Sequence, residues 1–508
     1  MAQDEQAWLD RGRACVLRGD LQGAESVFAS SLVEHPSSFD LRRALAGVYQ
    51  QTAKSERAEP LLHALHAERP QDFATAFALA RLRVAQARGN AAAQTLLECF
   101  KKGECDPELA IKAIELLDEA DRKAEAAAIA RIALAAKPDD MRLHAYAGML
   151  QLQLGQFEQA REHYLYALEH ASEACEWHVP LGLANAQRYE SAAHPDFARF
   201  LACAERTDLG PKARSTLLFA LGKAHDDIGA YAQAASYFRQ ANAIANSLTR
   251  WSRKDWRRGV EARLAARPLQ ISAPPSDDFI PVFIVGMPRS GTTLLAQLLA
   301  CFPRVRNRGE LPWIARFAQL PELAGEPSGS AIEHAAAEYR RQAMQDDSGD
   351  SRWFIDKQPL NFRYVDLILA MFPNARIIHS ERSARDTALS LWMQSFTEDV
   401  QGHAYDFGDI AAVKQDEARL MERWRTLHGR SIHAVRYEEL VANPQAAVAG
   451  VANWMGVEQP TASPVGKSQP AISTASLWQA RQPVYRHSLE RWRNYEGCVP
   501  ELMRFPAS

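Results

Sequence analysis

The sequence lacks a long apolar run and an excess of either charge. No stretch among its 508 residues approaches 18 consecutive apolar side chains, so no membrane-spanning helix is predicted. The formal net charge is −3, which argues against strong sequence-independent binding to nucleic acid. The first residues, from Met1 to Glu5, are polar and acidic and predict no signal peptide. We therefore expect a cytoplasmic protein with no membrane and no nucleic-acid partner.

Cysteine is also scarce, and its pattern excludes two common uses. The seven cysteines are odd in number and widely scattered, and no two of them form a C-x-x-C pair. Zinc binding and thiol–disulfide chemistry are therefore not predicted. Reduced thiols are expected for Cys15, Cys99, Cys105, Cys175, Cys203, Cys301 and Cys498.

Glycine and proline are sparse in the first half of the chain, where alanine, leucine, glutamate and arginine dominate, as is typical of helices. A pattern of glycine, alanine at +5 and an aromatic residue at +9 begins at Gly19. It recurs twice more, and Pro36 and Pro70 lie 34 residues apart. The three sets are Gly19, Ala24 and Phe28; Gly155, Ala160 and Tyr164; and Gly229, Ala234 and Phe238.

This periodic pattern resembles the tetratricopeptide repeat, a pair of antiparallel helices. The small residue at +5 allows the two helices to approach closely. A single pair cannot bury its apolar face, so several pairs must stack. The resemblance implies an all-α superhelix over residues 4–250 with a concave groove. That groove would hold a protein or peptide acceptor, although a purely structural or dimerising scaffold is an open alternative.

The chain becomes basic after the repeats and then rich in proline. The basic tract between Arg250 and Arg267 could contact nucleic acid or acidic substrates, but a solvated helix face is favoured. Pro274 and Pro275 lie in a stretch with the composition of a linker. The expected organisation is therefore a repeat domain over 4–250, a basic linker over 251–276 and a second domain over 277–508.

The second domain opens on an apolar, β-branched run over residues 279–285 that predicts a buried parallel strand. A loop between Gly286 and Gly291 follows and leads into a helix. Unpaired amides at a helix N-terminus favour binding of a phosphate or another anion. In nucleotide triphosphatases a lysine stands at the place of Thr292, so ATP or GTP hydrolysis is not predicted. Arg289 supplies a charged fork suited to a terminal phosphate or sulfate.

The segment from Pro288 to Thr293 resembles the 5′-phosphosulfate loop of sulfotransferases that use 3′-phosphoadenosine-5′-phosphosulfate (PAPS). An arginine in this loop and the later Gly309-Glu310 are most similar to tyrosylprotein sulfotransferases and their bacterial tetratricopeptide-fused relatives. The resemblance implies a P-loop-like α/β domain with a parallel central sheet. It also implies that the 5′-phosphosulfate is held by Arg289, Ser290, Gly291, Thr292 and Thr293.

Two further residues match the catalytic positions of this family. Glu310 would take the proton from the acceptor hydroxyl, which is a poor nucleophile until a base accepts that proton. Lys357 would neutralise the charge that builds on the bridging oxygen of the leaving phosphate. The alternatives are an exposed loop glutamate and a surface pair between Lys357 and Asp356.

The remaining matches concern the nucleotide. Arg382 at a strand end and Ser390 on the next helix fit the 3′-phosphate pattern, and Tyr437 would contact the adenosine region. Ser476 would touch the sulfuryl group or the bridging oxygen, and Arg481 would assist at the 3′-phosphate. The last two could instead belong to a surface loop. His379 is expected to be a core residue and not a catalytic base.

Together these patterns predict in-line transfer of a sulfuryl group from PAPS to a hydroxyl, with no metal ion. Tyrosine in a protein or peptide is the expected acceptor, and a carbohydrate or small-molecule hydroxyl is the alternative. A repeat scaffold with a non-catalytic nucleotide site is a rival from another class. The sequence does not settle the oligomeric state, and a homodimer is one option.

Overall fold

The computed structural model describes residues 2–86, 88–103, 105–269, 276–345, 349–396, 399–458 and 488–506. It divides into two compact units, Met1–Leu150 and Gln151–Ser508. The later helices of the repeat region thus belong to the same unit as the central sheet. The domain limits expected from composition stay a prediction.

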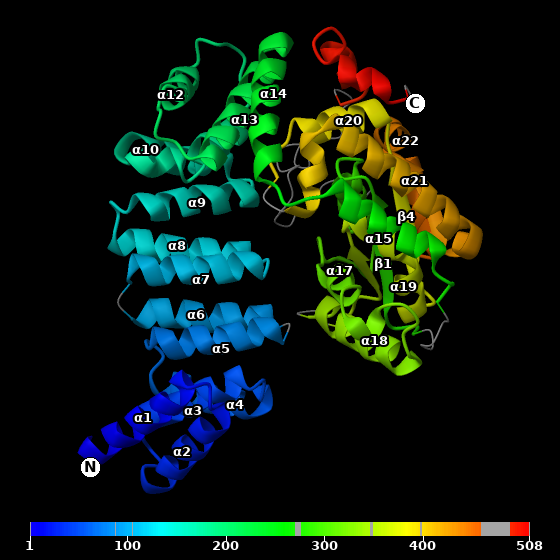
Figure 1. Ribbon diagram of the computed structural model, residues 1–508. Coiled ribbons are helices and arrows are strands. Elements are labelled where there is room, and N and C mark those ends of the chain that lie inside the picture. Colours follow the sequence, from blue (N-terminus) through cyan, green and yellow to red (C-terminus); the bar gives the residue numbers. More distant parts are fainter. Residues whose placement is uncertain are drawn as a thin grey trace. The chain divides into compact units, whose positions relative to one another are not determined.

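The first unit is built from helices that contact their neighbours along the chain in successive pairs (Figure 1). Its described elements are all helical. They are α1 (Ala2–Leu17), α2 (Leu21–Glu34), α3 (Phe39–Gln51), α4 (Ser55–Glu68), α5 (Phe73–Ala85), α6 (Gly89–Lys102), α7 (Pro107–Glu119), α8 (Lys123–Ala136) and the start of α9 (Met141–Leu154).

The repeating glycine, alanine and aromatic residues have clear structural reasons. Gly19 lies between α1 and α2 with a φ of +79°, a left-handed conformation that favours glycine. Ala24 is fully buried and Phe28 is 1% exposed. The ring of Phe28 covers Gly12 so closely that a Cβ there would lie 2.2 Å from it. The two helices therefore pack at a distance that only small residues permit.

Replacing Phe28 by alanine should lower the free energy of unfolding by about 3 kcal/mol, because it leaves a cavity in the first helix pair. Urea denaturation followed by circular dichroism measures this loss. Leu17→Ala is the control, because Leu17 is 88% exposed and its loss removes no packing. Equal stabilities of the two variants would contradict the packing described here.

The second unit begins with the remaining repeat helices. The described ones are α10 (Phe157–His170), the 3₁₀ turn η1 (Ser172–Cys175), α11 (Val179–Asn185), α12 (Pro195–Ala204), α13 (Pro211–Asp227) and α14 (Tyr231–Leu248). Gly229 repeats the left-handed turn with a φ of +77°, and Phe238 covers Gly222 as Phe28 covers Gly12. The sequence period thus marks the same packing at both ends of the repeat region.

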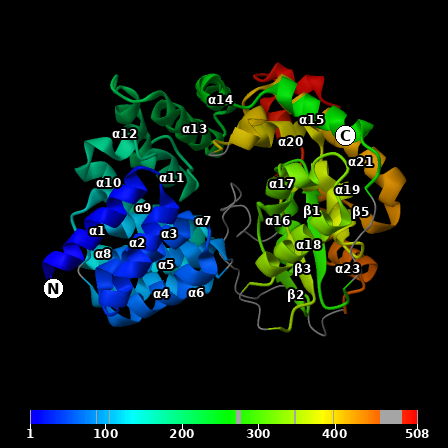
Figure 2. The ribbon, with the colours of Figure 1, turned by 60° about the horizontal axis from the view of Figure 1, so that its bottom comes forward.

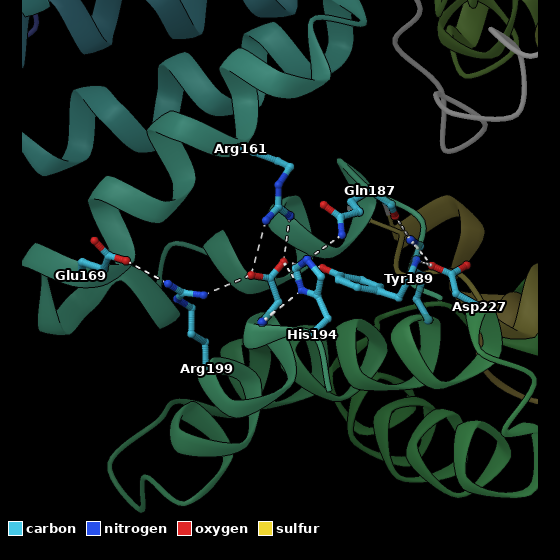
Figure 3. Close-up of polar contacts among 9 residues, drawn as sticks. Arg161, Glu169, Gln187, Tyr189, His194, Arg199 and Asp227 are labelled. Carbon is cyan, nitrogen blue, oxygen red and sulfur yellow. Dashed lines mark hydrogen bonds and ion pairs between the residues drawn. The ribbon is translucent and has the colours of Figure 1, made fainter. Parts of the chain in front are cut away.

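A buried polar network fixes the helices between these repeats (Figure 3). Asp196, at the start of α12, is fully buried and accepts hydrogen bonds from Arg161 at 2.7 Å and from the Tyr189 hydroxyl at 2.9 Å. Lys223 and Asp227 form a second pair on α13, 2.6 Å apart. The partners of each carboxylate named here lie inside the repeat region, so the network is structural.

The basic tract after the repeats contains helix α15 (Arg253–Ala265). Its apolar side is anchored by Trp256, which is 6% exposed and donates from Nε1 to Asp416 at 3.1 Å. Most of its basic side chains are exposed, and Arg258 is 72% exposed. The favoured interpretation, a solvated helix face, fits this arrangement.

A five-stranded parallel sheet organises the rest of the unit. The strand order is β2-β3-β1-β4-β5. The strands are β1 (Ile280–Gly286), β2 (Val305–Asn307), β3 (Trp353–Asp356), β4 (Arg376–Glu381) and β5 (Ile432–Arg436). The described helices among and after them are α16 (Thr292–Leu299), α17 (Trp313–Phe317), η2 (Pro321–Leu323), α18 (Gly329–Ala343), η3 (Pro359–Tyr364), α19 (Val365–Met371), α20 (Ala384–Trp392), η4 (Asp399–Tyr405), α21 (Phe407–His428), η5 (Gly429–Ser431), α22 (Tyr437–Ala442), α23 (Pro444–Met455), η7 (Arg491–Tyr495) and η8 (Pro500–Arg504).

Both faces of this sheet are covered, as an all-parallel sheet requires. Alternate residues of β1 enter two different cores: Val282 and Ile284 pack with α16 and α23, while Phe283 and Val285 pack with α18 to α21. The strands and their flanking helices can be followed in Figure 2. The predicted fold class, an α-helical repeat region followed by an α/β domain with a parallel central sheet, is confirmed.

Candidate active site

The loop after β1 is shaped by two glycines that cannot be replaced without strain. Gly286 has a φ of +141°, and a Cβ there would lie 2.4 Å from the carbonyl oxygen of Ser380 on the neighbouring strand. Gly291 has a φ of +93°, and its Cβ would lie 2.2 Å from the ring of Tyr437. These contacts seat the loop above the sheet and place the N-terminus of α16 at the end of β1.

Polar contacts fix the loop further. Ser290 is 1% exposed and donates from Oγ to the Met287 carbonyl at 2.7 Å. The Ser380 hydroxyl donates to the Ser290 carbonyl at 2.8 Å. Thr292 is 4% exposed and is the first residue of α16, which Thr293 continues. The five predicted loop residues therefore come together at one helix N-terminus, a favourable place for an anion.

The end of β4 brings the predicted 3′-phosphate residues to the same place. Arg382 donates to the carbonyl oxygens of Arg289 at 2.9 Å and Ser488 at 2.7 Å. Its guanidinium lies 4.7 Å from the centre of the Tyr437 ring. Arg289 donates from Nε to the Ser390 hydroxyl at 3.0 Å. The two predicted anion-binding groups are thus in direct contact, although their residues are about a hundred positions apart in the chain.

A small pocket opens between β4, α20 and the C-terminal segment. Besides Arg382, Ser390 and Tyr437, it is lined by Arg491. Asp386 holds the backbone of the C-terminal segment there, accepting from the amide of Glu490 at 2.9 Å and that of Trp492 at 3.0 Å. Burial raises the pKa of Asp386. The remaining lining residues are Leu389, Met393 and Ser488.

Arg491 is a residue that the sequence reasoning missed. Its Arg-Trp-Arg context looks like an ordinary helix face, and nothing in its spacing connects it with Arg382. One feature of the sequence could have pointed to Arg491: it lies a short distance after the segment that contains Ser476 and Arg481. Those two predicted residues lie outside the described part of the chain, so their roles stay predictions.

Glu310 and Lys357 meet at the ends of β2 and β3. The Lys357 ammonium forms an ion pair with Glu310 Oε1. The Lys357 side chain is 4% exposed and that of Glu310 is 28% exposed, so the carboxylate is the member of the pair that solvent reaches. The Lys357 amide also donates to the Gly309 carbonyl at 2.7 Å. The alternative of a surface pair between Lys357 and Asp356 is wrong, because Lys357 is buried and bonded to Glu310.

Asp356 instead supports the loop that carries Glu310. It is 1% exposed and accepts from the Leu311 amide at 3.3 Å and from the Tyr339 hydroxyl at 2.9 Å. Burial, together with the nearby Glu310 charge, raises the pKa of Asp356 to about 7. The two hydrogen bonds favour the ionised carboxylate and therefore oppose this rise in pKa.

This raised pKa predicts how stability depends on pH. Below about 4, the ordinary pKa, Asp356 is protonated in both the folded and the unfolded chain and contributes nothing. Between that value and about 7 only the unfolded chain loses the proton, so folding weakens as the pH rises. Relative to Asp356→Asn, the wild type should lose about 1.4 kcal/mol of unfolding free energy per pH unit in this window. Urea denaturation across the window checks this, and parallel profiles would contradict it.

Two other polar residues near the strand ends are buried. His379 is 2% exposed within β4 and bonds to Glu417, and its pKa is raised by the carboxylates of Glu417 and Glu381 against the effect of burial. The expectation of a core histidine is confirmed. Asn361 is 1% exposed, and its amide nitrogen and oxygen find no hydrogen-bond partner among the described residues.

Neither a membrane-spanning helix nor a metal-binding cluster occurs among the described residues. Within these ranges, no helix is both long and apolar enough to cross a membrane. In the same part of the chain, no group of three or more histidine, cysteine, aspartate or glutamate side chains is arranged to hold a metal ion.

Several known proteins are similar to parts of the chain. An uncharacterized protein of Aquifex aeolicus is 33% identical over 243 residues, which cover 44% of this chain and 32% of that protein. Protein-tyrosine sulfotransferase A of Caenorhabditis elegans is 24% identical over 246 residues, covering 43% of this chain and 62% of that enzyme. A tetratricopeptide-repeat protein of Thermus thermophilus has 21% identity and a TM-score of 0.24, covering 36% of this chain and 98% of that one.

The chain thus spans less than two thirds of the length of either of these curated relatives. The model described as the Sulfotransferase family matches residues 281–461. That match begins in β1 and includes the glycine loop, Glu310, Lys357, Arg382 and Tyr437. Residues 281–461 therefore form a domain of the sulfotransferase family, preceded in this chain by a region of helical repeats that has tetratricopeptide-repeat proteins among its structural neighbours.

Proposed function

We propose that this chain transfers a sulfuryl group from PAPS to a hydroxyl acceptor. One observation carries the proposal: the polar residues that follow β1 and β4 are in contact with one another, and an ion pair of Glu310 and Lys357 follows β2 and β3 at the same edge of the sheet. A nucleotide with charge at both its 5′ and its 3′ positions needs two anion-binding groups. In parallel sheets this edge is where ligands bind.

The residues present fit the 5′ end of such a nucleotide. Gly286 and Gly291 let the loop pack closely on Ser380 and Tyr437, and the amides at the N-terminus of α16 would then bind a phosphosulfate. A guanidinium and three hydroxyl groups would surround the phosphosulfate, supplied by Arg289, Ser290, Thr292 and Thr293.

The residues at the end of β4 fit a 3′-phosphate. Arg382 and Ser390 face one pocket together with Arg491. The Nε–H of Arg382 is buried and has no hydrogen-bond partner among the described residues. A buried donor in that state favours a bound acceptor such as a phosphate oxygen. Tyr437 would lie along the adenosine.

PAPS would supply the sulfuryl group, and the chain would supply acid–base and electrostatic assistance. Glu310 accepts the proton of the acceptor hydroxyl at its solvent-facing carboxylate. Lys357, buried beside it, places a fixed positive charge near the oxygen that leaves with the nucleotide. Ser476 and Arg481 would complete the site from the segment before Ser488.

A tyrosine of a protein or peptide is the proposed acceptor. Relatives in Caenorhabditis elegans, Drosophila melanogaster and Gallus gallus are named protein-tyrosine sulfotransferases, at 23 to 24% identity. Helical repeats of this type stack into surfaces suited to extended peptides. Both points support a peptide more than a small molecule.

Calorimetry with the full chain tests the nucleotide. Adenosine-3′,5′-bisphosphate should bind at least tenfold more tightly than AMP, because only the former reaches Arg382 and Ser390. Transfer of label from [³⁵S]PAPS to tyrosine peptides, glycans and small alcohols then identifies the acceptor. Equal affinities for the two nucleotides would overturn the proposal, and label in glycans alone would overturn the choice of tyrosine.

A further inference from the structure

One carboxylate of the repeat helices bonds to the C-terminal segment, including an arginine that lines the pocket. Asp226 lies near the end of α13, and its side chain is 7% exposed. It forms an ion pair with Arg491 and accepts a hydrogen bond from the Tyr495 hydroxyl at 2.6 Å. Both partners belong to η7, more than 260 positions later in the chain.

The adjacent residue shows how specific this contact is. Asp227 is paired with Lys223 at 2.6 Å and accepts from the Tyr189 amide at 3.1 Å, both within the repeat region (Figure 3). Two neighbouring carboxylates of one helix therefore point to different partners. Asp227 ties the repeat helices together, and Asp226 holds an arginine that lines the pocket.

The next repeat helix contacts α20, the helix that carries Ser390 and other lining residues of the same pocket. Asn242 of α14 is 2% exposed and donates to the Trp392 carbonyl at 2.8 Å. Trp392 ends α20, the helix that carries Ser390, and its ring lies 5.8 Å from that of Phe238. Helices α14 and α20 can be found near each other in Figure 1. The last helix pair of the repeats is thus built into the structure around the pocket.

A long arginine side chain has many rotamers, and ordering it at a ligand costs entropy. A carboxylate that already holds the guanidinium at the pocket removes part of that cost before the ligand binds. The charge of Asp226 is also largely neutralised by Arg491, so it repels a bound phosphate less than an unpaired carboxylate would.

We propose that Asp226 is a positioning residue that holds Arg491 at the 3′-phosphate, which makes the last repeat helices a part of the nucleotide site. The inference rests on the proposed function, because it assumes that the pocket takes a 3′-phosphate. Asp226 itself touches neither the nucleotide nor the acceptor; it acts through Arg491.

The test uses the full-length chain and calorimetry with adenosine-3′,5′-bisphosphate and AMP. Asp226→Asn should weaken binding of the bisphosphate about tenfold and leave AMP affinity unchanged. In turnover, KM for PAPS should rise by a similar factor while kcat stays within about twofold. Asp227→Asn, which removes the neighbouring carboxylate of the same helix, should leave both affinities unchanged.

A double-mutant cycle separates positioning from general stability. In an Arg491→Ala background, Asp226→Asn should cause no further loss of bisphosphate affinity, because the side chain it positions is gone. An equal loss in both backgrounds, or wild-type affinity in Asp226→Asn, would overturn the inference.

If Asp226→Asn also weakens AMP binding, the Asp226→Glu variant is measured instead. It keeps the charge but shifts it by one methylene, and wild-type bisphosphate affinity in that variant counts against the inference. A wild type without preference for the bisphosphate would overturn the proposed function and this inference with it.

Discussion

Replacing Glu310 by glutamine should lower the turnover of sulfuryl transfer by about a hundredfold or more, while the affinity for adenosine-3′,5′-bisphosphate stays within about twofold. The amide has the shape of the carboxylate but cannot accept the proton of the acceptor hydroxyl. Glu310 does not line the pocket of Arg382 and Ser390, so nucleotide binding should not depend on it. Initial rates with [³⁵S]PAPS at saturating acceptor, together with calorimetry, measure the two effects.

Lys357→Met should likewise lower turnover by about a hundredfold while the affinity for the nucleotide is retained. Methionine fills the buried space of the lysine stem but removes the charge near the leaving oxygen. Glu322→Gln is the control for loss of one acidic side chain, since Glu322 is exposed in η2. Near-normal turnover in both Glu310→Gln and Lys357→Met would refute the roles assigned to this pair.

Arg382→Ala should weaken binding of adenosine-3′,5′-bisphosphate by about a hundredfold and that of AMP by much less. Arg382 has a buried Nε–H without a partner among the described residues. Its other two guanidinium nitrogens donate to the Arg289 carbonyl in the loop and to the Ser488 carbonyl in the C-terminal segment. Its loss removes both a charge at the 3′-phosphate and part of the support of the pocket. Ser390→Ala should weaken the same ligand only several-fold, because it removes one hydroxyl.

The comparison of the two nucleotides distinguishes this role from general damage. A variant that merely unfolds the loop would lose AMP and the bisphosphate equally. Arg436→Ala removes a positive charge from the exposed end of β5, one residue before Tyr437, and should leave both affinities unchanged. If Arg382→Ala binds the bisphosphate as the wild type does, the pocket does not hold a 3′-phosphate.

Much of the fold could be predicted because its signals are local. Gly19 and Gly229 stand where a left-handed turn joins two helices, and Phe28 and Phe238 fill the matching cores. The apolar run before Gly286 is a buried strand, and the glycine spacing marks the loop that follows it. Each of these features is set within a few residues of chain, where backbone geometry and periodicity leave a readable pattern.

The candidate site was predicted in part for the same reason. Four site residues each follow the carboxyl end of a strand within three positions, namely Arg289, Glu310, Lys357 and Arg382. The strand ends of a parallel sheet meet at one edge. The prediction did not include the pairing of Lys357 with Glu310. The two residues are 47 positions apart, and their contact depends on β2 and β3 being neighbours in the sheet.

By itself, the sequence determined the repeat helices, the strands, the phosphate-type loop and the residue types available for chemistry. Only the tertiary structure decided that Tyr437 packs on Gly291, that Asp356 supports the Glu310 loop and that Asp226 meets Arg491. The physical reason is distance along the chain. Local patterns encode which backbone conformation forms, whereas side chains separated by tens to hundreds of residues meet only through the packing of helices and strands around a common core.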